Sequence, residues 1–143
     1  MGNIFTTQSK KKKKKNKNMS KTSDKKESTN IKKIESDEEF YNYLKKYKNI
    51  VVKFGAEWCN PCRRIMPYFE TLSLELKNTK DLKEVPLFIE IDIDEFPQLN
   101  EKYGGDSIPY FVILSGEKVK DKIQTSNEGK LKSFVYSNLS NLK

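Results

Sequence analysis

The stretch IVVKFGAEWCNPC, residues 50–62, decides the fold and contains both cysteines of the chain. It opens with β-branched apolar residues, which are typical of a buried strand. Cys59 and Cys62 follow where a helix should begin, because Pro61 is favoured in a first helical turn. One residue does not fit a buried strand, since Lys53 places an ammonium group among apolar neighbours.

Two cysteines at this spacing can belong to a metal site or to a redox dithiol. A structural zinc site needs four Cys or His ligands, and the chain has two cysteines and no histidine. Only a site shared between two chains could bind zinc, so we expect no metal and no bound cofactor. Cys59 lies at the helix N-terminus, where the helix dipole stabilises a thiolate. We therefore predict Cys59 as the nucleophile and Cys62, one turn further in, as the resolving thiol.

The charge of the chain lies at one end. Residues 1–30 contain ten lysines and two acidic residues, whereas residues 31–143 contain 18 basic and 18 acidic residues. Residues 1–30 also have few large apolar residues, so we predict a disordered tail. Residues 31–143 have the composition of one folded domain. Because the basic charge belongs to the tail, we expect no nucleic-acid partner.

The apolar pattern of residues 31–143 predicts an α/β domain with a central mixed sheet and helices on both faces. Within the second helix Pro67 predicts a kink, and Pro97 predicts an early interruption of the third. Predicted strands cover 31–34, 50–54, 87–94, 110–114 and 118–124, and predicted helices cover 36–47, 61–76, 94–102 and 127–139.

The segment FGAEWCNPCRR, residues 54–64, resembles the active site of the thioredoxin family, and the resemblance covers roughly residues 31 to 139. Ile108 and Pro109 resemble the family's Ile-Pro step before the hairpin and the last helix. The resemblance implies the thioredoxin fold and a Cys59–Cys62 disulfide. It also implies that Pro109 is cis, faces the cysteines and docks substrate. The residues implied to contact the substrate beside it are Trp58, Asn60, Pro61 and Ile108.

The chain departs from the family's pattern near the cysteines. Lys53 stands where the family usually has a buried Asp, and Glu90 stands where it has a Lys on the adjacent strand. Likewise, Gly55 occupies a position where the family often has a Trp. Asn60 and Gln124 occupy positions where the family has a glycine. An unpaired buried ammonium costs several kcal/mol, so we expect Lys53 to pair with Glu90. The alternative is that Lys53 extends to water through the gap beside Gly55.

Lys53 and Glu90 are also predicted to tune the redox pair. An ammonium beneath the cysteines should favour a thiolate at Cys62 and make the disulfide more oxidising. Glu90 should partly cancel this effect by holding the ammonium.

The first residues carry two membrane-directed signals. Met1, Gly2 and Thr6 fit the pattern for N-myristoylation of Gly2. One acyl chain binds membranes only marginally, so a second signal is needed. The run from Lys10 to Lys17 could provide it on an anionic surface, at about 1 kcal/mol per lysine. Alternatively the run is a low-complexity extension or a nuclear-import signal.

We expect a cytoplasmic protein, because the sequence shows neither an apolar run of about 18 residues nor a signal peptide. Its tail predicts a peripheral position on the cytosolic face of a membrane. Two functions remain open. The first is a thiol–disulfide oxidoreductase that acts on protein disulfides and is restored by an external thiol reductant or reductase. The second is an adaptor of the same fold with weak or no turnover, which the residues at Lys53, Gly55 and Gln124 favour.

Overall fold

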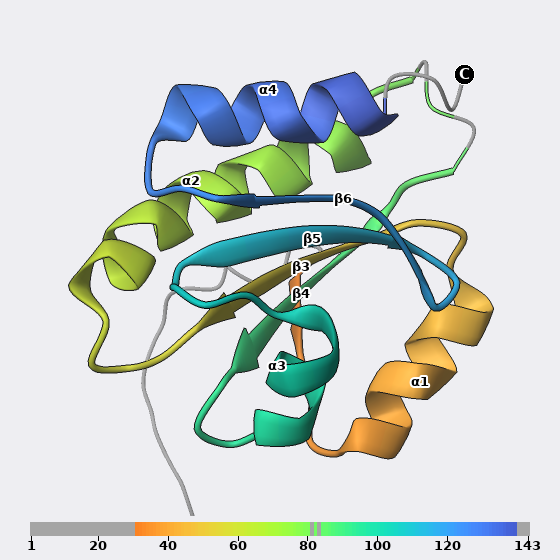
Figure 1. Ribbon diagram of the computed structural model, residues 1–143. Helices are drawn as coiled ribbons and strands as arrows, with labels where there is room; N and C mark the ends of the chain where they lie inside the picture. The colour runs from red at the N-terminus through yellow and green to blue at the C-terminus, as the bar shows by residue number, and fades with distance from the viewer. Residues whose placement is uncertain (1–30, 81, 83, 140–143) are drawn as a thin grey trace, which may run out of the picture.

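The computed structural model describes residues 31–80, 82 and 84–139. The predicted tail of residues 1–30, with its lipidation site and lysine run, therefore lies outside the described residues. The domain consists of one sheet between two layers of helices (Figure 1).

Within the described residues, five strands form a mixed sheet in the order β2-β4-β3-β5-β6. β2 and β3 both run parallel to β4, whereas β5 pairs antiparallel with β3 and with β6. All six residues of β3 are buried, as expected for a central strand, and they include Lys53. The strands are β2 (Ile31–Lys33), β3 (Ile50–Gly55), β4 (Leu87–Asp92), β5 (Tyr110–Ser115) and β6 (Lys118–Gln124).

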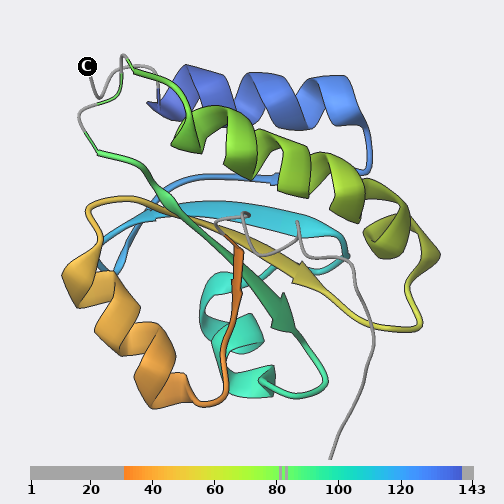
Figure 2. The ribbon, with the colours of Figure 1, turned by 180° about the vertical axis from the view of Figure 1, so that it is seen from behind.

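Helices cover both faces of the sheet, as predicted. Figures 1 and 2 show α1 and α3 on one face and α2 and α4 on the other. Side chains alternate along β3. Val52 and Phe54 therefore pack in the core between the sheet and helices α1 and α3, whereas Val51 packs in the core between the sheet and helices α2 and α4. The helices are α1 (Asp37–Lys46), α2 (Asn60–Lys77), α3 (Pro97–Tyr103) and α4 (Glu128–Leu139).

Local signals in the sequence explain several element ends. Ser36 caps α1, and its hydroxyl accepts a hydrogen bond from the backbone N–H of Glu39 at 3.1 Å. Asn127 caps α4 in the same way, through the N–H of Lys130 at 2.8 Å. Gly116 adopts a φ of 60° in the turn between β5 and β6. Glycine adopts this left-handed conformation without strain, so it fits the tight hairpin.

Two predicted boundaries are wrong by two or more residues. β4 ends at Asp92 rather than at residue 94, because the Asp92 carboxylate accepts hydrogen bonds from the N–H groups of Asp94 and Glu95 and forms a turn. The third helix begins at Pro97 rather than at Asp94. Proline at this position lacks only an N–H that would have no helical partner, so Pro97 starts the helix and does not interrupt it. α2 continues past Pro67 to Lys77, and the kink at Pro67 stays a prediction.

Candidate active site

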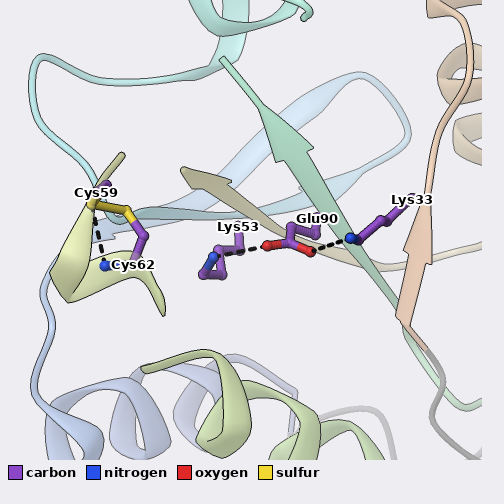
Figure 3. Close-up of polar contacts among 5 residues, drawn as sticks. All are labelled: Lys33, Lys53, Cys59, Cys62 and Glu90. Carbon is purple, nitrogen blue, oxygen red and sulfur yellow. Dashed lines mark hydrogen bonds and ion pairs between the residues drawn. A yellow bond between two sulfur atoms is a disulfide. The ribbon is translucent and has the colours of Figure 1, made fainter. Parts of the chain in front are cut away.

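The two cysteines lie at the junction of β3 and α2. Cys59 is the N-cap of α2, and its Sγ accepts a hydrogen bond from the backbone N–H of Cys62 at 3.2 Å. A turn in which the Cys59 N–H donates to the carbonyl of Ala56 brings the chain into the helix. The two cysteines form a disulfide, with their Cα atoms 5.3 Å apart (Figure 3). The predicted Cys59–Cys62 bond is therefore present.

The two sulfurs differ in their surroundings. Cys59 is 5% exposed and Cys62 is 1% exposed, so the second cysteine is the more deeply buried, as predicted. Ala56 completes this small apolar cluster, and Ile93 and Ile108 pack against it. The outer sulfur has the helix N-terminus beside it, which favours negative charge.

The loop before β5 lies against the cysteine cluster. The peptide bond between Ile108 and Pro109 is cis, as predicted. Ile108 packs against the cluster, so the loop lies next to the disulfide. Gln124 pairs with Tyr110 at the end of β6, on the strand beside this loop. The substrate contacts predicted for Ile108 and Pro109 stay predictions.

An exposed indole flanks the disulfide. Trp58 is 66% exposed, and its Nε1–H donates to Asp94 Oδ2 at 2.8 Å. Asn60 is exposed and Pro61 is half-buried, so both follow Cys59 on the surface of the helix start. Asp94 therefore holds the large side chain of the residue that precedes Cys59, and this contact between distant segments was not predicted.

Arg63 makes contacts beside the cysteines that were not predicted from the sequence. Its guanidinium donates to the backbone carbonyl of Glu57 and to Asn60 Oδ1. These contacts tie the loop before Cys59 to the first turn of α2. The three-residue spacing between Asn60 and Arg63 was an available signal, because such pairs are neighbours on a helix.

A row of charged side chains crosses the sheet beneath α2. In the strand register, Glu90 of β4 lies between Lys53 of β3 and Lys33 of β2. The Lys53 ammonium donates to Glu90 Oε2 at 3.1 Å, and Lys33 Nζ lies 3.9 Å from Glu90 Oε1 (Figure 3). Lys53 is 1% exposed. The predicted pairing is confirmed, and the alternative in which Lys53 extends to bulk water is wrong. Lys33 is a second partner that was not predicted.

A cleft of about 490 Å³ lies beside the inner cysteine and is lined by Lys53, Gly55, Cys62, Met66 and Phe96, among others. Gly55 lies next to both the Cys62 sulfur and the Lys53 ammonium. A Cβ at this position would lie 3.2 Å from Cys62 Sγ and 3.2 Å from Lys53 Nζ. Because glycine has no side chain, the ammonium and the sulfur face each other across it.

The residues that the structure describes contain no group of three or more His, Cys, Asp or Glu side chains that could hold a metal ion. Among these residues there is also no helix long and apolar enough to cross a membrane.

Comparisons with known proteins identify the family. A model of the thioredoxin family matches residues 30–137. Thioredoxin 1 of Plasmodium falciparum (isolate 3D7) is 30% identical over 105 residues, which cover 73% of this chain and 94% of the relative. Thioredoxin-1 of Schizosaccharomyces pombe is 30% identical over 110 residues, which cover 76% of this chain and 99% of the relative.

Solved structures give the same result. A structure of Plasmodium falciparum thioredoxin aligns with a TM-score of 0.66 and 29% identity, covering 74% of this chain and 97% of that one. A thioredoxin from Nicotiana alata, at 21% identity, supports the fold alone, with a TM-score of 0.68 over 78% of this chain and 94% of its own. The chain therefore belongs to the thioredoxin family, and it is a thiol–disulfide oxidoreductase with Cys59 and Cys62 as its redox-active pair.

Proposed function

We propose that the protein reduces disulfide bonds in other proteins, with Cys59 as the attacking thiolate and Cys62 as the resolving thiol. The observation that carries this assignment is the position of Cys59 at the N-cap of α2. Its sulfur accepts the N–H of Cys62 and lies at the positive end of the helix dipole, and both interactions stabilise a thiolate. Cys59 is also the less deeply buried of the two residues, at 5% exposed against 1% for Cys62.

The reaction proceeds through a mixed disulfide. The Cys59 thiolate attacks one sulfur of the substrate disulfide, the substrate S–S bond breaks, and the other substrate sulfur leaves as a thiolate. Cys62 then loses its proton and attacks Cys59 Sγ, which releases the second substrate sulfur and forms the Cys59–Cys62 disulfide. Two electrons pass from the cysteine pair to the substrate, and an external dithiol reductant or reductase returns them.

We assign substrate docking to the surface around the cysteines. The cis peptide bond at Pro109 and the contact of Ile108 with the cysteine cluster support this assignment. Exposed surface beside Cys59 comes from Trp58 and Asn60. Together with Pro61, these residues offer an apolar and polar surface to a substrate strand.

A Cys62→Ser variant tests the assignment of roles. Without the resolving thiol, the mixed disulfide at Cys59 should persist, and peptide mapping should find the substrate attached to Cys59. The matched control is Cys59→Ser, which should capture no substrate under the same conditions. Capture by Cys59→Ser instead of Cys62→Ser would reverse the two roles, and equal capture would show that neither sulfur has a dedicated role.

We also propose that the protein is held at the cytosolic face of a membrane by a myristoylated Gly2 and the lysines from Lys10 to Lys17. Two sequence features support this proposal: the pattern formed by Met1, Gly2 and Thr6, and the adjacent basic run. The remaining residues, 31–143, carry equal numbers of basic and acidic groups, so the tail is the part with charge for an anionic surface.

Fractionation of cells that express the full chain tests the anchor. Gly2→Ala should move the protein from the membrane fraction to the soluble fraction, and mass spectrometry should find the acyl group on wild type alone. Thr7→Ala is a control that leaves the myristoylation pattern intact. If Gly2→Ala remains with membranes as wild type does, the lipid anchor is refuted.

A further inference from the structure

The inner cysteine has a cation next to it. Lys53 Nζ and Cys62 Sγ each lie 3.2 Å from the position of a Cβ at Gly55, so the two atoms are no more than twice that distance, about 6.4 Å, apart. Both line the same cleft. In Figure 3 Lys53 lies between the disulfide and Glu90. The Cys62 sulfur therefore has a buried ammonium on its inner side, while the helix N-terminus acts on Cys59.

We propose that the Lys53 ammonium stabilises the thiolate form of Cys62 in the reduced protein and thereby makes the cysteine pair a stronger oxidant. This inference rests on the proposed function, because it concerns the same two sulfurs. Lys53 is a positioning residue: it acts through the charge on Cys62 and does not touch the substrate.

Glu90 opposes this effect. Its carboxylate accepts a hydrogen bond from Lys53 at 3.1 Å, so part of the ammonium's field is cancelled. A unit charge about 6 Å away, at an effective dielectric constant of about 20, changes an ionisation constant by roughly two decades. Glu90 offsets about one decade of this effect, so the two charges together raise the constant about tenfold, whereas removing Lys53 alone, with Glu90 in place, should lower it by roughly two decades.

Other charged groups share the cleft with Cys62, and they are unchanged in every variant that we propose. Differences between variants therefore report on Lys53 and Glu90. These groups are Lys33, Arg63, Glu57, Glu70, Asp92 and Glu95.

The link to oxidising strength follows from the electron balance. When a dithiol reduces the disulfide, one donor thiolate attacks Cys59 Sγ, the S–S bond breaks, and the electron pair leaves on Cys62 Sγ. The second donor thiolate attacks the donor sulfur of the mixed disulfide, which releases Cys59 as a thiolate and oxidises the donor to a disulfide. Stabilising the anion on Cys62 stabilises the reduced pair, and a more stable reduced pair is a stronger oxidant.

The test follows the ionisation of Cys62 as the single cysteine of a Cys59→Ser background, by thiolate absorbance against pH. Into this background we place Lys53→Met, Glu90→Gln or Gly55→Ala. The matched control is Lys48→Met, which removes an exposed lysine just before β3, at the strand end opposite the cysteines.

The three variants have signed expectations. Lys53→Met should lower the ionisation constant of Cys62 about a hundredfold relative to Lys48→Met, because Glu90 stays in place. Glu90→Gln should raise it, because the ammonium then loses its counter-charge. Gly55→Ala keeps both charges but inserts a methyl group between Nζ and Sγ, so it should lower the constant by less than Lys53→Met does.

A second measurement uses the chain with both cysteines. The equilibrium constant for reduction by dithiothreitol should fall by up to about a hundredfold in Lys53→Met at a pH where Cys62 is ionised in wild type. At acidic pH the two proteins should agree, because Cys62 is then protonated in both. A packing effect of Lys53 would not produce this dependence on pH.

A decrease of at least threefold for Lys53→Met, together with an increase for Glu90→Gln, supports the proposal. A smaller decrease, or changes of the same sign in both variants, overturns it. If Lys53→Met does not fold, Glu90→Gln decides, and an unchanged or lower constant overturns the proposal. The ionisation needs neither substrate nor turnover, so its result is separate from the capture of substrate by Cys62→Ser.

Discussion

The ion pair beneath α2 predicts an unequal cost for removing its two partners. In Lys53→Met, Glu90 is left without its 3.1 Å partner, but its side chain is 23% exposed and Lys33 still lies 3.9 Å away. In Glu90→Gln, the ammonium of Lys53 stays 1% exposed with only a neutral acceptor. Because an uncompensated buried charge is the more unfavourable, Glu90→Gln should destabilise the fold more.

The magnitudes follow from the distance and the burial. At 3.1 Å, and with an effective dielectric constant of about 20, the attraction is about 5 kcal/mol, most of which desolvation of Lys53 offsets. We expect Glu90→Gln to lower the free energy of unfolding by about 3 kcal/mol and Lys53→Met by about 1 kcal/mol. The double variant should lose about 2 kcal/mol, which gives a coupling energy of about 2 kcal/mol.

Urea denaturation of the oxidised full chain measures all four proteins, provided that their m-values agree. The decisive comparison is between the double variant and Glu90→Gln. Adding Lys53→Met to Glu90→Gln removes the unpaired ammonium, so the double variant should be the more stable of the two. If the double variant is instead the less stable, or the coupling energy is below about 0.5 kcal/mol, the two side chains do not form an energetically coupled pair.

Three further predictions concern the core, the packing of α4 and the docking surface. Phe69→Ala should lower the free energy of unfolding by about 3 to 5 kcal/mol in urea denaturation, because Phe69 is 0% exposed; a loss below 1 kcal/mol would contradict its place in the core. Burial and the hydrogen bond to Glu75 at 2.7 Å raise the pKa of Tyr136 to about 12, so the folded state keeps a proton that the unfolded state loses near pH 10. Stability should therefore fall as the pH rises from about 10 to 12, and Tyr136→Phe should reduce this fall in pH-dependent urea titrations; an equally steep fall in the variant would assign it to other groups. Trp58→Ala should lower kcat/KM for a protein disulfide about tenfold and leave that for a small disulfide nearly unchanged, since Trp58 is 66% exposed; equal losses would place the indole in the chemistry and not in docking.

Local signals in the sequence were enough to predict the central strand and the cysteine pair at the start of a helix. The β-branched start of residues 50–62 and the proline after Cys59 each favour one conformation, and the structure adopts both. The resemblance to the thioredoxin family supplied the cis bond before Pro109, which no local pattern indicates. Lys53 was informative because a buried ammonium requires a partner.

The contacts that were not predicted join segments whose relative placement depends on the whole fold. Lys33 reaches Glu90 only because the register of the edge strand β2 places them opposite each other. Asp94 reaches Trp58 across 36 residues of sequence. The early end of β4 depends on a turn made by the side chain of Asp92, and this preference competes with the apolar pattern that predicted a longer strand.

Turnover of a disulfide-bonded protein, with dithiothreitol as the electron donor, tests the central claim most directly. Wild type should reduce the substrate many times faster than dithiothreitol alone, while Cys59→Ser should match the rate of dithiothreitol alone. The rate should also rise in proportion to the amount of wild-type protein. The opposite result would be a folded wild-type protein whose Cys59–Cys62 disulfide is reduced by dithiothreitol but which gives no rate above that of dithiothreitol alone. This result would contradict the account and identify the chain as an adaptor.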